Sequence, residues 1–165
     1  TTNQQRDILN IIAEETKLHV VCVIDEDPQT EEKFKKELND KLMELSNTTG
    51  QFYKGNLRSG QVIETETSII VIGDVNPGSR ITSKGNIIVL GSLKGSVFAG
   101  ASGNANSFVV ALDMNPVQIR IADTIARSPD KPEKSTVKET KIAFLEDGNI
   151  YIEPLSKEVI NDINL

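Results

Sequence analysis

The residues that could perform chemistry are few in this sequence. His19 is the only histidine and Cys22 the only cysteine, and both lie in an aliphatic run. A lone His in such a run is usually structural, and one His with one Cys cannot complete the four ligands of a structural zinc site. Asp25, Glu26 and Asp27 follow and are typical of a solvated acidic linker. We therefore predict no catalytic residue, no metal site and no cofactor.

Two short segments with glycine are candidates for a surface role. Residues 100–103, Gly-Ala-Ser-Gly, lack the Lys and the spacing of a phosphate-binding loop, so we interpret them as a turn. Arg58, Ser59, Gly60 and Gln61 offer a guanidinium, a hydroxyl, an amide and a glycine that lets another backbone approach. From these residue types alone, a turn at the entry to the following repeat is the simpler interpretation.

The composition limits the class of protein. The chain has 165 residues, a net charge of −6, 38% hydrophobic residues and only 4% aromatic residues, without Trp. The core must therefore be aliphatic, and the acidic balance argues against sequence-independent binding of nucleic acid, which depends on Lys and Arg. A single cysteine excludes an intramolecular disulfide framework and fits a reducing, cytoplasmic compartment. No apolar run approaches the roughly 20 residues that cross a bilayer.

Residues 1–27 predict one helix and one strand. Ile8, Ile11 and Ile12 recur at helical spacing, and residues 18–24 form a β-branched run that is typical of a buried strand. One helix and one strand do not make a domain. We therefore interpret residues 1–27 as the C-terminal remnant of a larger α/β N-terminal domain.

Residues 28–50 are predicted to be a linker helix. Thr30 is its expected N-cap, and the helix should end near Ser46. One face of this helix carries an apolar stripe that consists of Phe34, Leu38, Leu42 and Leu45, and its other face is almost wholly charged. Residues 1–50 together carry a net charge of −5, against +2 for residues 51–127 and −3 for residues 128–165.

The middle of the chain contains an 18-residue repeat. Residues 68–75, Ser-Ile-Ile-Val-Ile-Gly-Asp-Val, align with residues 86–93, Asn-Ile-Ile-Val-Leu-Gly-Ser-Leu. Degenerate third and fourth copies are predicted at 108–112 and 117–121. Short strands separated by Gly and Pro at this period predict a coil with three sides, whose stacked turns place aliphatic ladders in the interior. The expected fold class for residues 51–165 is all-β, a short right-handed triangular parallel β-helix.

Alternation along these strands implies that one aliphatic ladder points away from the coil. In the strand at 68–72, either Ile70 and Ile72 or Ile69 and Val71 must face outward. A second copy in a face-to-face dimer would cover such a ladder best, and the N-terminal helices are the alternative cover. The residues taken as candidate dimer contacts are Ile69, Val71, Ile87 and Val89.

The region from 52 to 123 resembles the C-terminal domain of the bacterial septum-site-determining MinC family. The matching blocks include Tyr-Lys-Gly-Asn-Leu-Arg-Ser-Gly-Gln at 53–61, Gly-Asp-Val-Asn-Pro-Gly at 73–78 and Val-Gln-Ile-Arg-Ile-Ala at 117–122. Residues 149–155 resemble the family's terminal strand. The resemblance implies a dimeric triangular β-helix that is a cell division inhibitor and not an enzyme.

The resemblance also implies partners. Residues matching the family's Arg-Ser-Gly-Gln motif would bind MinD, a membrane-associated ATPase, and here these are Arg58, Ser59, Gly60 and Gln61. MinD would recruit the cytoplasmic protein to the inner face of the membrane, where it antagonises assembly of the tubulin-like FtsZ away from mid-cell. The family's N-terminal domain, its main inhibitor, is about twice as long as the part that precedes the linker here. We place no FtsZ-contact residue in this chain.

Two other classes of function are the alternatives. β-Solenoid acyltransferases need a catalytic base, usually His, on the coil, and residues 51–165 contain none. Enzymes that act on polysaccharides usually have more coils and acidic metal clusters. A self-polymerising solenoid would need uncapped ends, whereas the charged segment 128–139 is suited to interrupt stacking.

Overall fold

The structure is a computed structural model that describes residues 28–127 and 138–163. The helix and strand predicted within residues 1–27, with His19 and Cys22, lie outside the described residues, as does most of the charged segment 128–139. The chain divides into two compact units between Asn39 and Asp40, and each is described by itself.

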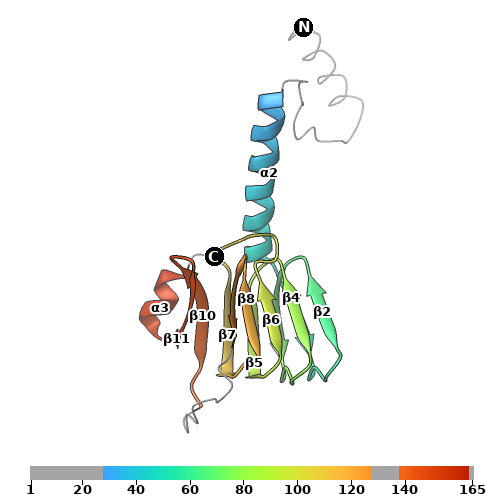
Figure 1. Ribbon diagram of the computed structural model, residues 1–165, viewed down its shortest axis with the longest axis vertical. Helices are drawn as coiled ribbons and strands as arrows, with labels where there is room; N and C mark the ends of the chain where they lie inside the picture. Colours follow the sequence, from blue (N-terminus) through green and yellow to red (C-terminus); the bar gives the residue numbers. More distant parts are fainter. Residues whose placement is uncertain (1–27, 128–137, 164–165) are drawn as a thin grey trace, which may run out of the picture. The chain divides into compact units, whose positions relative to one another are not determined.

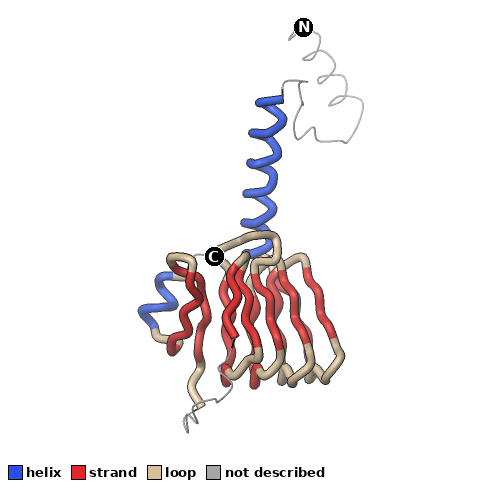
Figure 2. The backbone as a smooth tube through the Cα atoms, viewed as in Figure 1, coloured by secondary structure: helices blue, strands red, loops and turns tan. Residues whose placement is uncertain are grey.

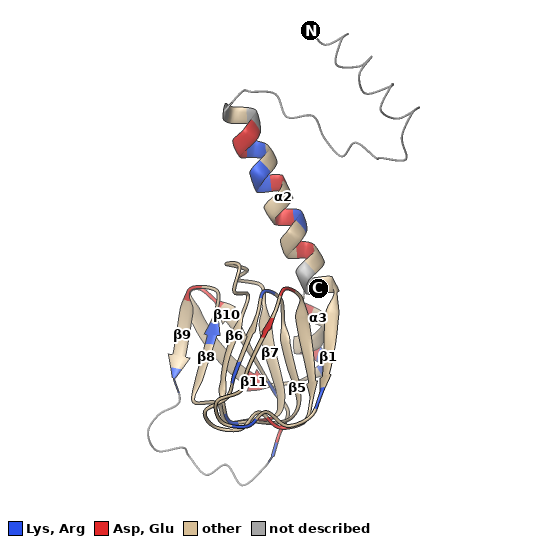
Figure 3. Ribbon diagram, turned by 90° about the vertical axis from the view of Figure 1, so that its right-hand side faces the viewer, with Lys and Arg blue, Asp and Glu red and all other residues tan. Residues whose placement is uncertain are grey.

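The helix α2, in the segment predicted to be a linker, spans Pro28–Thr48 and is longer than the sequence predicted. It begins before Thr30, with Pro28 in the first turn, where the missing N–H of proline costs no hydrogen bond. The Nζ of Lys35 lies 2.6 Å from the Oε1 of Glu31, and this bond lowers the pKa of the Glu31 carboxyl. Both signs of charge alternate along α2, whereas the strands carry few charges (Figure 3). Leu38, Leu42 and Leu45 are about half exposed.

The described residues from Gly50 onward form two sheets of short stacked strands (Figure 1). Sheet A has the order β1-β3-β5-β7-β10-β11, and sheet B has the order β2-β4-β6-β8-β9. The strands are β1 (Gly50–Lys54), β2 (Val62–Thr65), β3 (Ser68–Ile72), β4 (Arg80–Ser83), β5 (Ile87–Leu93), β6 (Ser96–Ala99), β7 (Phe108–Met114), β8 (Gln118–Ile121), β9 (Thr124–Arg127), β10 (Lys141–Glu146) and β11 (Asn149–Pro154).

The pairing confirms a three-sided parallel coil. In sheet A, Ile69 pairs with Ile87, its equivalent in the next copy of the repeat. The third side has no long strand, and single parallel bridges join Leu57 to Val75 and Val75 to Leu93. Short turns connect the sides (Figure 2). The predicted all-β, β-helical fold class is therefore confirmed.

The third copy of the repeat lies where the sequence predicted it, and the fourth does not. The third copy is β7, which pairs in parallel with β5, but Ile87 lies opposite Val109 because residues 100–107 form a longer corner than the earlier coils have. The fourth copy was wrong, since residues 118–121 form β8, which belongs to sheet B and pairs with β6. The repeat is longer in this coil than in the earlier ones. The spacing of the strands along the sequence therefore did not show which strand belongs to sheet A and which to sheet B.

Like residues stack in the interior of the coil. Ile81, Val97 and Ile119 form one ladder on sheet B, and Leu57, Val75 and Leu93 form another on the third side. All of these side chains are almost completely buried. On sheet A, the interior ladders are Ile69, Ile87 and Val109 beside Val71, Val89 and Ala111.

The same ladders correct the predicted dimer contacts. Ile69, Val71, Ile87 and Val89 are 0–2% exposed and belong to the hydrophobic core, so they cannot form an outward face. The outward pair in β3 is Ile70 and Ile72, so the predicted contacts were wrong. Both pairs in this strand are aliphatic, and the residue types therefore did not show which pair faces outward. Apolar residues that face outward on the first coils of sheet A are Phe52, Ile70, Ile72, Ile88 and Leu90, and Leu112 faces outward on β7.

Antiparallel strands end the stack. β9 pairs antiparallel with β8 on sheet B, and β10 pairs antiparallel with β7 on sheet A. The hairpin of β10 and β11 confirms a strand at the predicted terminal position. The short helix α3 (Lys157–Asp162) follows, with Ser156 as its N-cap. Val159 packs against Phe108, Val110 and Ile142 on the outer side of sheet A.

The inward and outward assignment predicts a difference in stability between two Val→Ala substitutions. Val89→Ala removes methyl groups from a fully buried side chain, whereas Val62 is 57% exposed on sheet B. We expect Val89→Ala to lower the free energy of unfolding by about 2–3 kcal/mol and Val62→Ala by less than about 1 kcal/mol. Urea denaturation followed by circular dichroism measures both, and equal losses would contradict the assignment.

Candidate functional site

The four residues singled out by the sequence form a tight turn in the first coil, between the third side and β2. The N–H of Gln61 donates to the carbonyl of Arg58 at 3.0 Å, which closes a β-turn. Gly60 has φ of +84°, which position i+2 of a type II turn requires. The backbone N–H of Arg58 donates to the Oε1 of Gln61 at 2.6 Å. The amide of Gln61 therefore shapes the turn in addition to being exposed.

The turn is seated on an equivalent turn in the next coil. The N–H of Gly60 donates to the carbonyl of Gly78 at 2.9 Å. Gly78 has φ of +80° in the turn that Asn76 and Ser79 close, and Pro77 fills position i+1. A Cβ at Gly78 would overlap the Oγ of Ser59, so the absence of a side chain at Gly78 lets the first turn lie this close to the second.

Two cations that the sequence reasoning missed lie near Arg58. The bridges from Leu57 to Val75 and from Val75 to Leu93 bring Arg58 and Lys94 to the same corner, two coils apart. Arg80 is nearby, because its N–H donates to the carbonyl of Gln61. Arg58, Arg80 and Lys94 are all exposed. The repeat, followed from Arg58 through position 76 to Lys94, would have revealed this cationic corner.

The site is suited to binding rather than to acid–base chemistry. Arg58, Ser59, Gly60 and Gln61 are all exposed, and the described ion pairs leave the guanidinium of Arg58 unpaired. The described ranges 28–127 and 138–163 contain no group of three or more His, Cys, Asp or Glu that could hold a metal ion. What the corner offers is a rigid main chain with cationic and hydrogen-bonding side chains.

The segment 100–103 is a turn, as expected. The N–H of Gly103 donates to the carbonyl of Gly100 at 2.9 Å. Gly100 fits a compact corner, because a Cβ there would overlap the carbonyl of Asn104. The segment lies between β6 and β7, away from the turn of Arg58 in the first coil.

The seating of one turn on the other predicts unequal effects of two Gly→Ala substitutions. Both glycines have positive φ, but a Cβ at Gly60 would meet nothing within 4 Å, whereas one at Gly78 would overlap Ser59. We expect Gly60→Ala to cost about 1 kcal/mol of stability and Gly78→Ala at least about 1 kcal/mol more. Thermal denaturation measures the difference, and adding Ser59→Ala should recover part of the loss in Gly78→Ala. A cost of Gly78→Ala no larger than that of Gly60→Ala would refute the contact.

Comparisons with known proteins identify the family of this chain. The family model "Septum formation inhibitor MinC, C-terminal domain" matches residues 51–155. The chain is 45% identical over 186 residues to the probable septum site-determining protein MinC of Lachnospira eligens, covering 100% of this chain and 76% of the relative. It is 41% identical over 178 residues to that of Agathobacter rectalis, covering 97% and 73%.

A solved structure has the same fold. A chain of the MinC:MinD cell division protein complex of Aquifex aeolicus matches with a TM-score of 0.60 and 29% identity, over 69% of this chain and 94% of that chain. The family match begins at residue 51, where the coil begins, and includes the turn of Arg58 and the terminal hairpin. The chain therefore belongs to the MinC family of septum formation inhibitors.

Proposed function

We propose that this chain is a non-enzymatic adaptor in septum site selection. It binds the ATPase MinD, is recruited through MinD to the inner face of the membrane, and there antagonises assembly of FtsZ away from mid-cell. Family membership supports the role in septum placement. The observation that carries MinD as a partner is the likeness to a chain of the MinC:MinD complex. Among the described residues, no helix is long and apolar enough to cross a membrane.

Arg58, Ser59, Gly60 and Gln61 are the proposed contact for MinD. Their turn is held by hydrogen bonds within itself and to the next coil, so little conformational entropy is lost when a partner binds it. Arginine is enriched among the residues that contribute most to protein interfaces, because its planar guanidinium donates several hydrogen bonds. Arg80 and Lys94 extend the positive potential around Arg58, which favours an acidic partner surface and speeds its association.

The outer side of sheet A is the proposed homodimer interface. Phe52 is 75% exposed, and Ile72, Leu90 and Leu112 are each nearly half exposed. With Ile70 and Ile88 they form the apolar surface of sheet A, which water solvates poorly. A second copy that presents the same surface would bury it through a two-fold contact. This surface replaces the interior residues first taken as dimer contacts.

An enzymatic role has less support from the described residues. Residues 51–127 and 138–163 contain no histidine that could act as a general base on the coil. A cavity among the described residues lies at the last coil, whereas the turn of Arg58 lies in the first. The alternative of an acyltransferase or a polysaccharide-acting enzyme is therefore not favoured by any specific observation.

The MinD proposal predicts that Arg58→Ala weakens ATP-dependent binding to MinD by about tenfold or more, because the main cationic donor of the turn is lost. Co-sedimentation with MinD, ATP and anionic lipid vesicles measures it. Arg127→Ala is the matched control, since Arg127 is an exposed arginine on β9 at the other end of sheet B. If Arg58→Ala and the unaltered chain sediment equally, the proposed contact is wrong.

The dimer proposal predicts that Leu90→Glu yields a monomer at micromolar concentration, because it places a charge within the apolar surface of sheet A. Val62→Glu makes the same kind of change at an exposed apolar residue of sheet B and should leave the dimer intact. Sedimentation equilibrium gives the mass of each. An unaltered chain that is monomeric, or a Val62→Glu variant that dissociates as readily, would count against this interface.

A further inference from the structure

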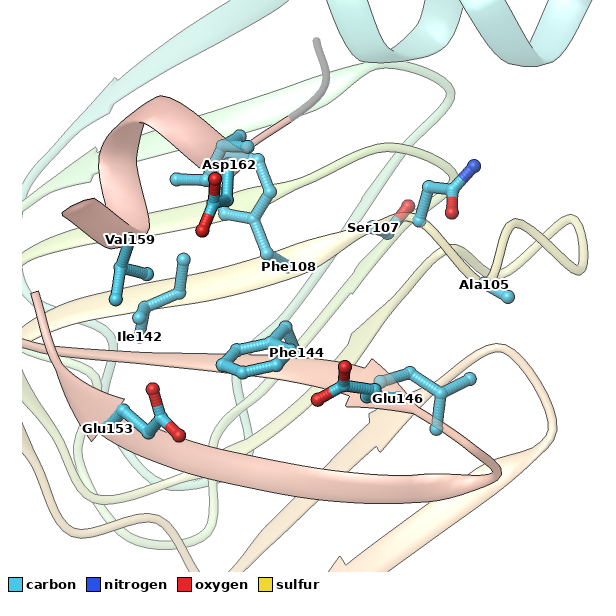
Figure 4. Close-up of a pocket in the computed structure, with 12 residues that line it drawn as sticks. Ala105, Ser107, Phe108, Ile142, Phe144, Glu146, Glu153, Val159 and Asp162 are labelled. Atoms are coloured by element: carbon cyan, nitrogen blue, oxygen red, sulfur yellow. The ribbon is translucent and has the colours of Figure 1, made fainter.

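A cavity lies on the outer side of sheet A at the last coil, far in the stack from the turn of Arg58. Its volume is about 400 Å³, within the range of roughly 300–1,000 Å³ that is usual for ligand pockets. Its walls come from the loop before β7, from the hairpin of β10 and β11, and from α3 (Figure 4). No residue of the proposed MinD contact or of the apolar surface of sheet A lines this cavity.

The floor of the cavity is apolar. Phe108, Ile142 and Phe144 lie together at its centre, and Val159 of α3 closes one side (Figure 4). Phe108 and Ile142 are buried at the base of the second hydrophobic cluster, against which Phe144 and Val159 pack. The partly exposed ring of Phe144 is therefore the main apolar surface that the floor offers to a bulky apolar side chain.

Three carboxylates surround this floor. Glu153 and Asp162 lie on one side of the aromatic residues and Glu146 lies on the other (Figure 4). All three residues are exposed, and no Lys or Arg is among the residues that line the cavity. The ion pairs found between described residues involve Glu31, Glu44 and Glu66 and none of these three carboxylates. The rim is therefore negative without an internal counter-charge.

A buried hydroxyl in the wall has no hydrogen-bond partner among the described atoms. Ser107 is fully buried, lines the cavity, and has an Oγ that neither donates nor accepts a bond there. A buried polar group without a partner costs free energy, roughly 1–3 kcal/mol. Because this Oγ is inaccessible and lies beside Gly100 in the corner, it offers no contact to a ligand, and the cavity's binding chemistry comes from its floor and its rim.

We propose that this cavity binds a peptide segment in which a bulky apolar side chain, such as Phe or Leu, stands next to Lys or Arg. The apolar side chain would occupy the floor formed by Phe108, Ile142 and Phe144. The neighbouring cations would pair with Glu146, Glu153 and Asp162 on the rim, where unpaired carboxylates favour positive charge. The site would take a basic, apolar segment of a partner protein, and it depends neither on MinD binding nor on the dimer.

The probe is the blocked peptide acetyl-Lys-Phe-Lys-Lys-amide, whose residue order occurs at positions 33–36 of this chain. It is titrated into the full, isotope-labelled chain at low ionic strength, and backbone amide shifts are followed by NMR. We expect saturable shifts that centre on Ser107, Phe144 and Val159. Replacing Phe by Ala in the peptide should weaken binding by about tenfold or more, because the burial of the aromatic ring is lost.

The matched protein variants test the rim. Glu146→Gln with Glu153→Gln should weaken binding by about tenfold, since two charge-assisted contacts are lost. Glu64→Gln with Asp123→Asn removes the same charge from exposed positions outside the cavity and should change binding little. Absence of saturable shifts, or equal weakening by both double variants, or equal binding of the Phe and Ala peptides, would each overturn the proposal. A peptide with Glu in place of each Lys should not bind, and its binding as tightly as the probe would also overturn it.

Discussion

The parallel register between successive coils is the constraint on which the rest of this structure depends. Each strand of the parallel coils donates and accepts main-chain hydrogen bonds with the strand one coil away, as in the pairing of Ile69 with Ile87. Because the offset repeats, each inward position is occupied by a stack of similar side chains, and Ile, Val and Leu fill the interior without large aromatic rings. The low aromatic content of the chain is a consequence of this geometry.

The same register produces the cationic corner. A type II turn in the first coil rests on a type II turn in the second, and Gly60 and Gly78 occupy the same place in both. Stacking therefore fixes the backbone that presents Arg58, and it brings Lys94 to the same edge from two coils away. The corner is thus held by main-chain hydrogen bonds between coils of the same kind as those that hold the sheets.

The sequence was sufficient to predict the coil but insufficient to predict which side of each strand in sheet A faces inward. Residues 68–75 and 86–93 repeat so closely that the three-sided stack could be predicted from them alone. In residues 69–72, however, every side chain is aliphatic, so alternation shows that one pair faces outward without showing which. Sheet B carries the missing signal: Ile63 and Ile81 alternate there with Glu64 and Arg80, which identifies its inward face directly.

The acidic cavity could not have been predicted, because the residues that form it break the repeat. Ser107 ends the longer corner that takes β7 out of the period of the earlier coils, Phe108 begins β7, and Glu146 and Glu153 lie on an antiparallel hairpin. Antiparallel strands end the parallel stack, and α3 then covers the outer side of sheet A only over β7 and β10. The outer side of sheet A therefore has an open part, which is the apolar surface over the first coils, and the acidic cavity at the last coil. Ile88 lies at the boundary of the two parts, because it faces the open part and also packs against the hydrophobic cluster at the base of the cavity.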